Sequence, residues 1–472
     1  MRNIRYLCLS DLHLGEEDSL LTNVADPSRP SPVVRSLAEC IAEVLRHNQP
    51  DAPKPTLILA GDVLELALET TQRALAVFEQ FLWSAMPANG ELFGEIVCLP
   101  GNHDHHMWQA AREAQYLGYL GRLAPGETIQ PPWDTTKVVM DFAGKDRLVS
   151  GALTAIARRL PHLRERGFEV LTAYPNFGIR QDGRAVVVTH GHFIEPAYRF
   201  FSTLASLFFP AQTLPQDVYT LERENSAWID FFWSTLGSCG RIGPDIESIY
   251  EASGDDSSLH RLTDTLAHSI AVQYPLPKWA PRAVREWVLE AALHEIAGGV
   301  STGLERRQAA SDTILGPDSA KGAHWYAEEM LRRQFQQETG SVPDSLTFVF
   351  GHTHKPFVDR WPAASVFNTG GWVIDAPRAQ PLHGAAAVLA GEDLSTVALR
   401  FYNEGTYQVR VEEPLAPGAA HSELHDHLSA ILKAQPQLWK EFGETVHTEA
   451  DLRMAALAAR LNLRSKAAGA AH

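Results

Sequence analysis

The sequence has little cysteine and no long apolar run, and both absences narrow the class of protein. Only four of its 472 residues are cysteines, and no two of them form a C-x-x-C pair. We therefore expect Cys8, Cys40, Cys98 and Cys239 to be reduced thiols of a cytoplasmic protein. No run of about 18 apolar residues occurs, so no transmembrane span is expected. The chain opens on a strand-like run, without a basic segment followed by an apolar signal region.

An excess of positive charge is also missing. The chain has 41 basic and 57 acidic side chains, which gives a net charge of −16. This balance disfavours a nucleic-acid partner held by a basic surface. Metal ligands contribute part of the negative charge, and a bound metal would offset it. With 45% hydrophobic residues, the chain can bury a large core, as one large domain with insertions or as two to three domains.

The first hundred residues alternate between two kinds of apolar pattern. Residues 4–9, 56–60 and 95–100 are continuous apolar runs of the length of buried strands. Residues 32–47 and 75–85 have apolar side chains at helical spacing, the first of them after a Ser-Pro start. Strands that alternate with helices and have no polar face predict a sheet covered by helices, in an α/β fold.

Further along, the pattern predicts a core that is interrupted by a helical insertion. Residues 177–190 resemble a hairpin around Asp182-Gly183. Apolar residues then recur at helical spacing, for example at 284–296, before the strand-like run 346–350 resumes the sheet. The predicted parts are a first core segment at 1–195, a mostly helical insertion or cap at 196–345, a second core segment at 346–412, and C-terminal helices and a tail at 413–472.

Five polar clusters each follow an apolar strand directly. They are D-x-H at 11–13, G-D at 61–62, G-N-H-D at 101–104, H-G-H at 190–192 and G-H-T-H at 351–354. Each alone can be an ordinary turn, but five in succession are not a coincidence. Ligands bind at the carboxyl ends of strands in open α/β sheets, so these clusters are expected at one edge.

A cluster of Asp, His and Asn at one edge suits two metal ions. Two divalent ions about 4 Å apart can neutralise a phosphate ester and ionise a water near neutral pH. The mixed oxygen and nitrogen ligands suit manganese, with iron, zinc, cobalt or nickel as alternatives, better than magnesium or calcium.

The ordered motifs resemble those of the calcineurin-like metallophosphoesterase superfamily. The resemblance implies a four-layer αββα sandwich with the two-metal site at the strand ends, and here the fold would carry a large helical insertion. "SDLHLG", "GDVLEL" and "NTGGW" are most similar to the branch of UDP-2,3-diacylglucosamine hydrolases. Those proteins are far shorter, and their fourth motif usually ends in Asp, where this chain has His192.

The resemblance also implies a role for each motif residue. Asp11, His13 and His354 would hold one ion, Asn102, His190 and His352 would hold the other, and Asp62 would bridge both. A hydroxide between the ions would be the nucleophile. His103 would protonate the leaving oxygen or stabilise the charged transition state, and Asp104 would orient it.

Two interpretations are open for each of several side chains near the motifs. His192 either touches the substrate phosphate or supports a metal ligand, and Lys355 either contacts that phosphate or is solvated. Glu65 lies either behind the ligands or on the surface. His105 and His106 are expected to begin a solvent-exposed helix.

Two interpretations are also open for the insertion. Its aromatic segments at 198–210 and 228–237 form either the core of the cap or an apolar lid that receives an acyl chain or touches a membrane surface. The predicted function is hydrolysis of phosphoester or pyrophosphate bonds in a small-molecule or lipid-linked substrate. The alternatives are a nuclease of the same superfamily and a non-catalytic protein-binding scaffold.

Overall fold

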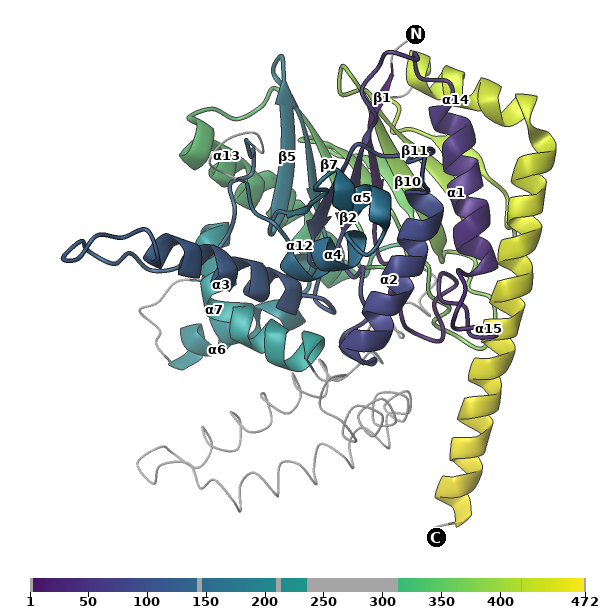
Figure 1. The fold of residues 1–472 in the computed structure, drawn as a ribbon, viewed down its shortest axis with the longest axis horizontal. Coiled ribbons are helices and arrows are strands. Elements are labelled where there is room, and N and C mark those ends of the chain that lie inside the picture. Colours follow the sequence, from purple (N-terminus) through teal and green to yellow (C-terminus); the bar gives the residue numbers. More distant parts are fainter. Residues whose placement is uncertain (1–2, 142–146, 209–213, 236–312, 417, 471–472) are drawn as a thin grey trace.

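The computed structural model describes residues 3–141, 147–208, 214–235, 313–416 and 418–470. Within them, a seven-stranded sheet has the order β12-β11-β10-β1-β2-β3-β4 (Figure 1). Strands β1 to β4 pair in parallel, while β10 to β12 run antiparallel to their neighbours. The bounds are β1 Ile4–Leu9, β2 Thr56–Ala60, β3 Glu95–Leu99, β4 Val170–Thr172, β10 Gly384–Gly391, β11 Thr396–Asn403 and β12 Arg410–Glu412.

A second sheet of five described strands has the order β5-β6-β7-β9-β8. Its central pairs β6/β7 and β7/β9 are parallel, and its outer pairs are antiparallel. The β5–β6 hairpin turns at Asp182 and Gly183, both with positive φ, as the sequence predicts. The bounds are β5 Asn176–Gln181, β6 Arg184–Thr189, β7 Ser345–Phe350, β8 Phe357–Arg360 and β9 Ser365–Asn368.

The two sheets pack face to face because alternate strand residues point to opposite faces. Cys8, Ile58 and Val97 of the first sheet share one buried core with Val186 and Val349 of the second. The intervening strand residues face outward into two further cores, each covered by helices. The four-layer αββα sandwich that the sequence predicts is confirmed.

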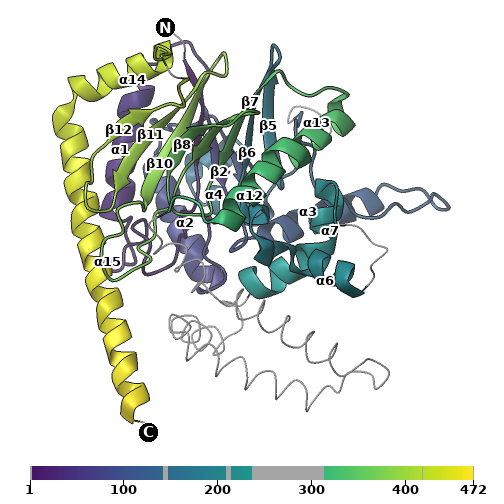
Figure 2. The ribbon, with the colours of Figure 1, turned by 180° about the vertical axis from the view of Figure 1, so that it is seen from behind.

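Helices from both ends of the chain cover the outer face of the first sheet. Ser31 caps α1 by accepting from the Val33 amide, and Thr70 caps α2 by accepting from the Arg73 amide. In Figure 2, α15 runs along this side of the molecule beside α1. The bounds are α1 Pro32–Leu45, α2 Thr71–Ala85, α4 Gly151–Ala157, α5 Pro161–Glu165, α14 Glu423–Ala434 and α15 Pro436–Ala470.

The described part of the insertion covers the outer face of the second sheet, together with α3 (His106–Leu120). Its elements are η2 Pro196–Arg199, α6 Phe200–Phe208, α7 Val218–Ile229, η3 Asp230–Ser234, α12 Pro317–Trp325, η5 Tyr326–Met330 and α13 Leu331–Thr339, after η1 His192–Ile194. The helical pattern at 284–296 and Cys239 lie outside the described residues.

Candidate metal centre

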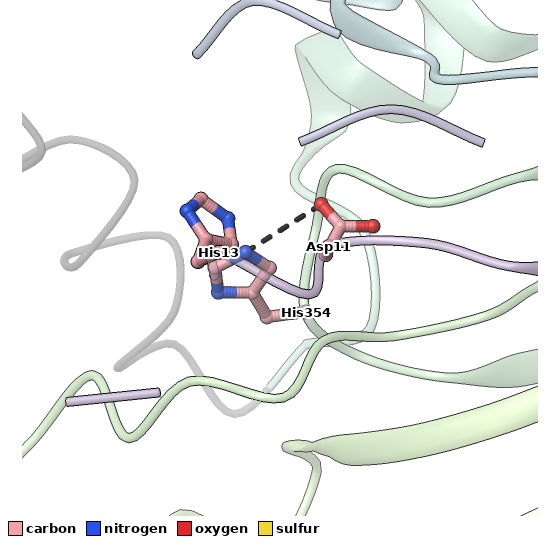
Figure 3. A group of neighbouring side chains, drawn as sticks. All are labelled: Asp11, His13 and His354. Carbon is pink, nitrogen blue, oxygen red and sulfur yellow. Dashed lines mark ion pairs between the residues drawn. The ribbon is translucent and has the colours of Figure 1, made fainter. Parts of the chain in front are cut away.

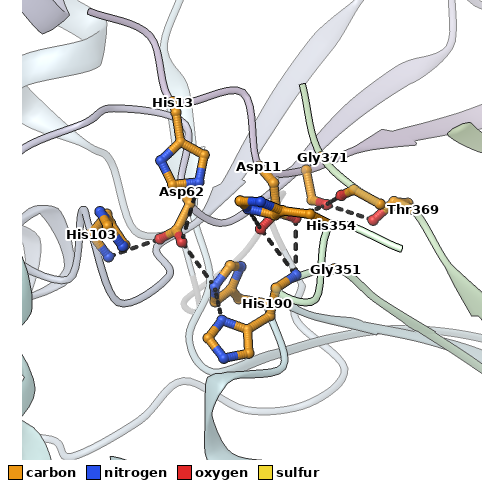
Figure 4. A network of polar contacts seen from close by, with 12 residues as sticks. Asp11, His13, Asp62, His103, His190, Gly351, His354, Thr369 and Gly371 are labelled. Atoms are coloured by element: carbon orange, nitrogen blue, oxygen red, sulfur yellow. Dashed lines mark hydrogen bonds and ion pairs between the residues drawn. The ribbon is translucent and has the colours of Figure 1, made fainter. Parts of the chain in front are cut away.

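The five motifs lie where their strands end. Asp11 and His13 follow β1, Asp62 follows β2, and Asn102 and His103 follow β3. His190 follows β6, and His352 and His354 follow β7 of the second sheet. Both sheets therefore contribute to the site, and its side chains converge across the sandwich (Figure 4).

The backbone at these strand ends is unusual. Nine non-glycine residues of the described chain have positive φ, and five of them belong to the motifs: Asp11 (51°), His13 (43°), Asp62 (48°), His352 (69°) and His354 (54°). Such conformations cost on the order of 1–3 kcal/mol each and concentrate at functional sites. The backbone is therefore strained at the residues whose side chains turn toward one another.

The motif glycines are required by close packing against carboxylates. A Cβ at Gly101 would come 2.3 Å from Oδ1 of Asp62, and a Cβ at Gly351 would come 2.1 Å from Oδ2 of Asp11. Any larger residue would displace these carboxylates. The glycine of G-N-H-D and that of G-H-T-H are therefore part of the site, although neither offers a ligand atom.

Asp11, His13 and His354, the first ligand group, lie together with their ligand atoms within 4.8 Å of one another (Figure 3). Nε2 of His354 lies 3.6 Å from Oδ1 of Asp11. Burial acts to raise the pKa of Asp11, but the hydrogen bond from His354 and the charge of His190 outweigh it and lower that pKa. The carboxylate is therefore kept ionised, as a metal ligand must be.

Asn102, His190 and His352, the second ligand group, surround one point together with Asp62. Nε2 of His190 lies 2.9 Å from Oδ1 of Asn102, 3.2 Å from Oδ2 of Asp62 and 3.2 Å from Nδ1 of His352. The same Asp62 oxygen lies 3.8 Å from Nε2 of His13. Asp62 thus stands between the two groups, as Figure 4 shows.

The arrangement of these atoms requires a proton or a metal ion between them. Nδ1 of His190 lies 3.1 Å from the carbonyl oxygen of Ala60, which only accepts, so Nδ1 carries the hydrogen. In the neutral ring Nε2 then presents a lone pair to an amide oxygen, a carboxylate oxygen and another imidazole. Lone pairs that face one another repel unless a proton or a metal ion lies between them. The donor set fits a divalent transition metal.

Hydrogen bonds to carboxylates also fix the orientation of two other ligand imidazoles. Nδ1 of His13 donates to Glu65 at 2.7 Å, and Nδ1 of His354 donates to Asp375 at 2.8 Å. Each bond directs Nε2 of the ring toward the centre, and Nε2 of His13 is buried with no hydrogen-bond partner among the described residues. Carboxylates behind ligand histidines are the usual support of metal sites.

His103 is oriented by Glu65. Its backbone amide donates to Oδ1 of Asp62 at 2.8 Å, and its Nδ1 donates to Oε1 of Glu65 at 2.9 Å. Burial acts to raise the pKa of Glu65, but the charges and hydrogen bonds of His103 and His13 lower it to about 2. Glu65 thus lies behind the ligands, which is one of its two predicted positions.

The prediction that Asp104 orients His103 is wrong. Both oxygens of Asp104 accept backbone amides instead: those of Gly101 at 2.6 Å, Val63 at 2.9 Å and Leu64 at 3.2 Å. Asp104 therefore ties the loop after β2 to the loop after β3. Burial and the neighbouring Asp62 raise its pKa to about 6. Sequence adjacency to His103 was misleading, because the two side chains leave the turn in different directions.

His192 and Lys355 have different surroundings. His192 is buried, donates to or accepts from the Tyr174 hydroxyl at 3.2 Å, and is not among the described residues that line the pocket. Its ring lies 5.5 Å from that of His190, between centres, and its contact with the substrate stays a prediction. Lys355 lines the pocket, and its Nζ donates to the Thr313 carbonyl at 2.9 Å. It is only 3% exposed, so it is not a solvated lysine.

Sequence reasoning missed several residues around the site. Asp375 and Glu195 carry no motif and reach the pocket only through the fold. The prediction that His105 is exposed is wrong: it is fully buried, with Nε2 3.1 Å from Glu222 of α7. The helix start at His106 is correct, but the insertion covers the preceding turn.

Apolar and charged side chains line the pocket together with several of the candidate ligands. Its described lining includes His13, Glu16, Asp62, Leu68, His103, Glu195, Ile314, Leu315, Gly316, Ser319, His352, Thr353, His354, Lys355, Val373 and Asp375. Residues 314–319 come from the end of the insertion. The insertion therefore forms one wall of the pocket in which a substrate would meet the metal centre.

A family model described as calcineurin-like phosphoesterase matches residues 4–212. The match spans less than half of the chain and contains four of the five motifs, while G-H-T-H lies beyond it. It supports the calcineurin-like phosphoesterase superfamily and a phosphoesterase with divalent metals, and the observed fold is that of these enzymes. The match does not distinguish the predicted branch of UDP-2,3-diacylglucosamine hydrolases from other branches.

Two solved structures have a distant likeness to the chain. A dimetal phosphatase from Danio rerio is 11% identical with a TM-score of 0.30, over 86% of this chain and all of that one. Phosphopantetheinyl hydrolase from Mycobacterium tuberculosis is 14% identical with a TM-score of 0.24, over 78% of this chain and 90% of that one. At these scores neither likeness bears on the activity. No curated protein matches the chain.

Helices of membrane-spanning character are absent from the part of the chain that the structure describes. None of the helices there combines the length and the apolar composition that a bilayer crossing needs.

Proposed function

We propose that this chain hydrolyses phosphoester or pyrophosphate bonds at a two-metal centre. In this proposal the first ligand group and the second ligand group each hold one ion, and Asp62 contacts both. The observation that carries the proposal is the set of lone pairs that meet around Nε2 of His190, within 3.2 Å of three further ligand atoms. Such a set is repulsive unless a proton or a metal ion lies within it, and its mixed donors suit a divalent metal ion.

The chain's own residues would perform the remaining work. Two divalent ions, when bound, supply charge neutralisation and a water that ionises near neutral pH. His103 lines the pocket and, held by Glu65, donates a proton to the leaving oxygen. Asp62 holds the amide of His103 while it contacts the ligands, so it aligns the proton donor with the metal centre.

We further propose that Lys355 holds the substrate phosphate and that Leu68, Ile314, Leu315 and Val373 face the leaving group. Lys355 is the cation among the described lining residues besides the histidines, and these four apolar side chains line the same pocket. This composition supports a substrate with an apolar leaving group, including the lipid-linked class and the sugar nucleotides of the diacylglucosamine branch. Buried free thiols at Cys8, Cys40 and Cys98 support a cytoplasmic location.

The test is metal analysis followed by a substrate screen. Protein loaded with manganese is expected to hold about two ions per chain and to hydrolyse members of a panel of nucleotides, phosphodiesters, phospholipids and UDP-sugars. Treatment with a chelator should abolish that activity, and manganese should restore it. Substoichiometric metal without turnover would instead favour the protein-binding scaffold.

A further inference from the structure

Two described parts of the insertion close on the core beside the second ligand group. We call residues 196–208 and 214–235 the outgoing arm and residues 313–344 the return arm. The inference below rests on the two-metal site proposed above. It concerns which part of the chain holds the ligands of the second ion in place.

The outgoing arm contacts Asn102 through Tyr198. Tyr198 lies in η2 and is 1% exposed. Nδ2 of Asn102 donates to its hydroxyl oxygen at 3.1 Å, which leaves Oδ1 directed toward His190. In this arrangement the hydroxyl oxygen of Tyr198 holds the amide nitrogen, and the one acceptor oxygen of the amide faces the ligand point. The Tyr198 ring also packs edge-on against His352, with ring centres 5.1 Å apart.

The return arm reaches His352 through Glu195. Ser319 of α12 donates to Oε1 of Glu195 at 3.2 Å. The other oxygen, Oε2, lies 3.5 Å from Nε2 of His352, which has no hydrogen-bond partner among the described residues. Nδ1 of the same ring faces His190. Glu195 therefore lies beside the outer nitrogen of a ligand histidine, at a longer distance than Glu65 and Asp375 have from theirs.

The return arm packs against the core so closely that a larger side chain would not fit at Gly322. A Cβ at Gly322 of α12 would come 1.7 Å from the carbonyl oxygen of Ile194. The guanidinium of Arg199 lies over the Trp325 ring, 4.8 Å from its centre, which joins the two arms. Glycine inside a helix normally weakens it, and here it permits this close approach.

We propose that the two arms of the insertion position the ligands of the second metal ion. Tyr198 fixes the amide of Asn102, and Ser319 fixes Glu195 behind His352. The first ligand group relies on Glu65 and Asp375, which both belong to the core. Affinity for the second ion therefore depends on the docked insertion, and affinity for the first ion does not.

The test is a two-step manganese titration of the full-length protein after chelator treatment. Tyr198→Phe removes one hydroxyl and should weaken the second step by about tenfold, with the first step unchanged. The electron paramagnetic resonance signal of a coupled manganese pair should fall at equal loading. Tyr326→Phe is the matched control, because this buried hydroxyl in the same core bonds Asn176 and no ligand.

Ser319→Ala tests the return arm and should also weaken only the second step. If wild type binds two ions and both variants titrate as wild type does, this inference is overturned and the proposed function stands. Equal weakening in Tyr198→Phe and Tyr326→Phe also overturns it, since a loosened core then explains the effect. A wild type that binds no second ion overturns the proposed function itself.

Discussion

The two ligand groups of the candidate centre are supported by different parts of the chain. Behind the first group stand Glu65 and Asp375, which lie on loops of the sandwich. Behind the second group stand Tyr198 and Glu195, and the insertion supplies or holds both of them. The sandwich alone thus supports one complete half of the site, while the other half also needs the element that forms a wall of the pocket.

This difference suggests how an insertion acquires an influence on chemistry. A cap that only covers a pocket changes which substrates enter. A cap that also holds Asn102 and His352 connects the wall of the pocket to the geometry of the candidate ligands. The predictions below separate the two halves, beginning with the residue that they share.

Asp62→Asn is expected to have the largest effect. Asp62 contacts both groups and the amide of His103, and a neutral amide cannot balance two divalent ions. We expect loss of both ions and a fall in turnover of more than about a thousandfold, measured by metal analysis and phosphatase assay. Asp182→Asn, at a positive-φ aspartate in the β5–β6 turn, is the control and should keep both. Retention of one full ion by Asp62→Asn would contradict the shared role.

His103→Ala should remove chemistry without removing metal. The ring lines the pocket and belongs to neither ligand group, so we expect turnover to fall by roughly 10²- to 10⁴-fold with two ions still bound. His106→Ala, half exposed on the next turn of the chain, should leave both quantities unchanged. A loss of metal in His103→Ala would show that this ring is a ligand rather than a proton donor.

Glu65→Gln is the counterpart of the Tyr198→Phe experiment. The carboxylate accepts from both His13 and His103, and an amide cannot accept equally from two rings. We expect the first step of the manganese titration to weaken by about 10- to 100-fold while the second step changes little. Equal weakening of both steps would remove the distinction between a half supported by the core and a half supported by the insertion.

The sequence predicted the parts of the site that have a local signature. Asp11, Asp62 and His352 follow strands directly, where the chain turns sharply, so residue order predicts that they lie at one edge of the fold. Glu195 and Asp375 become recognisable only when the two sheets pack, because no short pattern marks a carboxylate that supports a distant histidine. Buried strands with helices between them predicted a sheet covered by helices, whereas the four-layer sandwich followed only from the resemblance to the superfamily.

The errors have a common physical cause. His105 was expected to begin a solvent-exposed helix, whereas Glu222 of the insertion contacts it and the residue is buried. Asp104 was assigned to its neighbour in the sequence, whereas its oxygens accept amides from a separate loop. Both errors concern surfaces that are covered by segments far away along the chain, which residue spacing does not report.

The smallest expected effect concerns the docking of the outgoing arm. Burial acts to lower the pKa of His105, but the charges of Glu222 and Asp230 outweigh it and raise that pKa to about 9; the Tyr174 ring packs on the same imidazole. A raised folded-state pKa contributes stability that is complete below about pH 6.5 and is lost as the pH rises through about 9. Between pH 6.5 and 9.5 we therefore expect the free energy of unfolding to fall, by on the order of 1–3 kcal/mol from this group. Urea unfolding of wild type and His105→Gln at both pH values measures the difference. The variant should lose less stability than wild type over this range, and an equal loss in both proteins would show that His105 is not charged in its contact with the insertion.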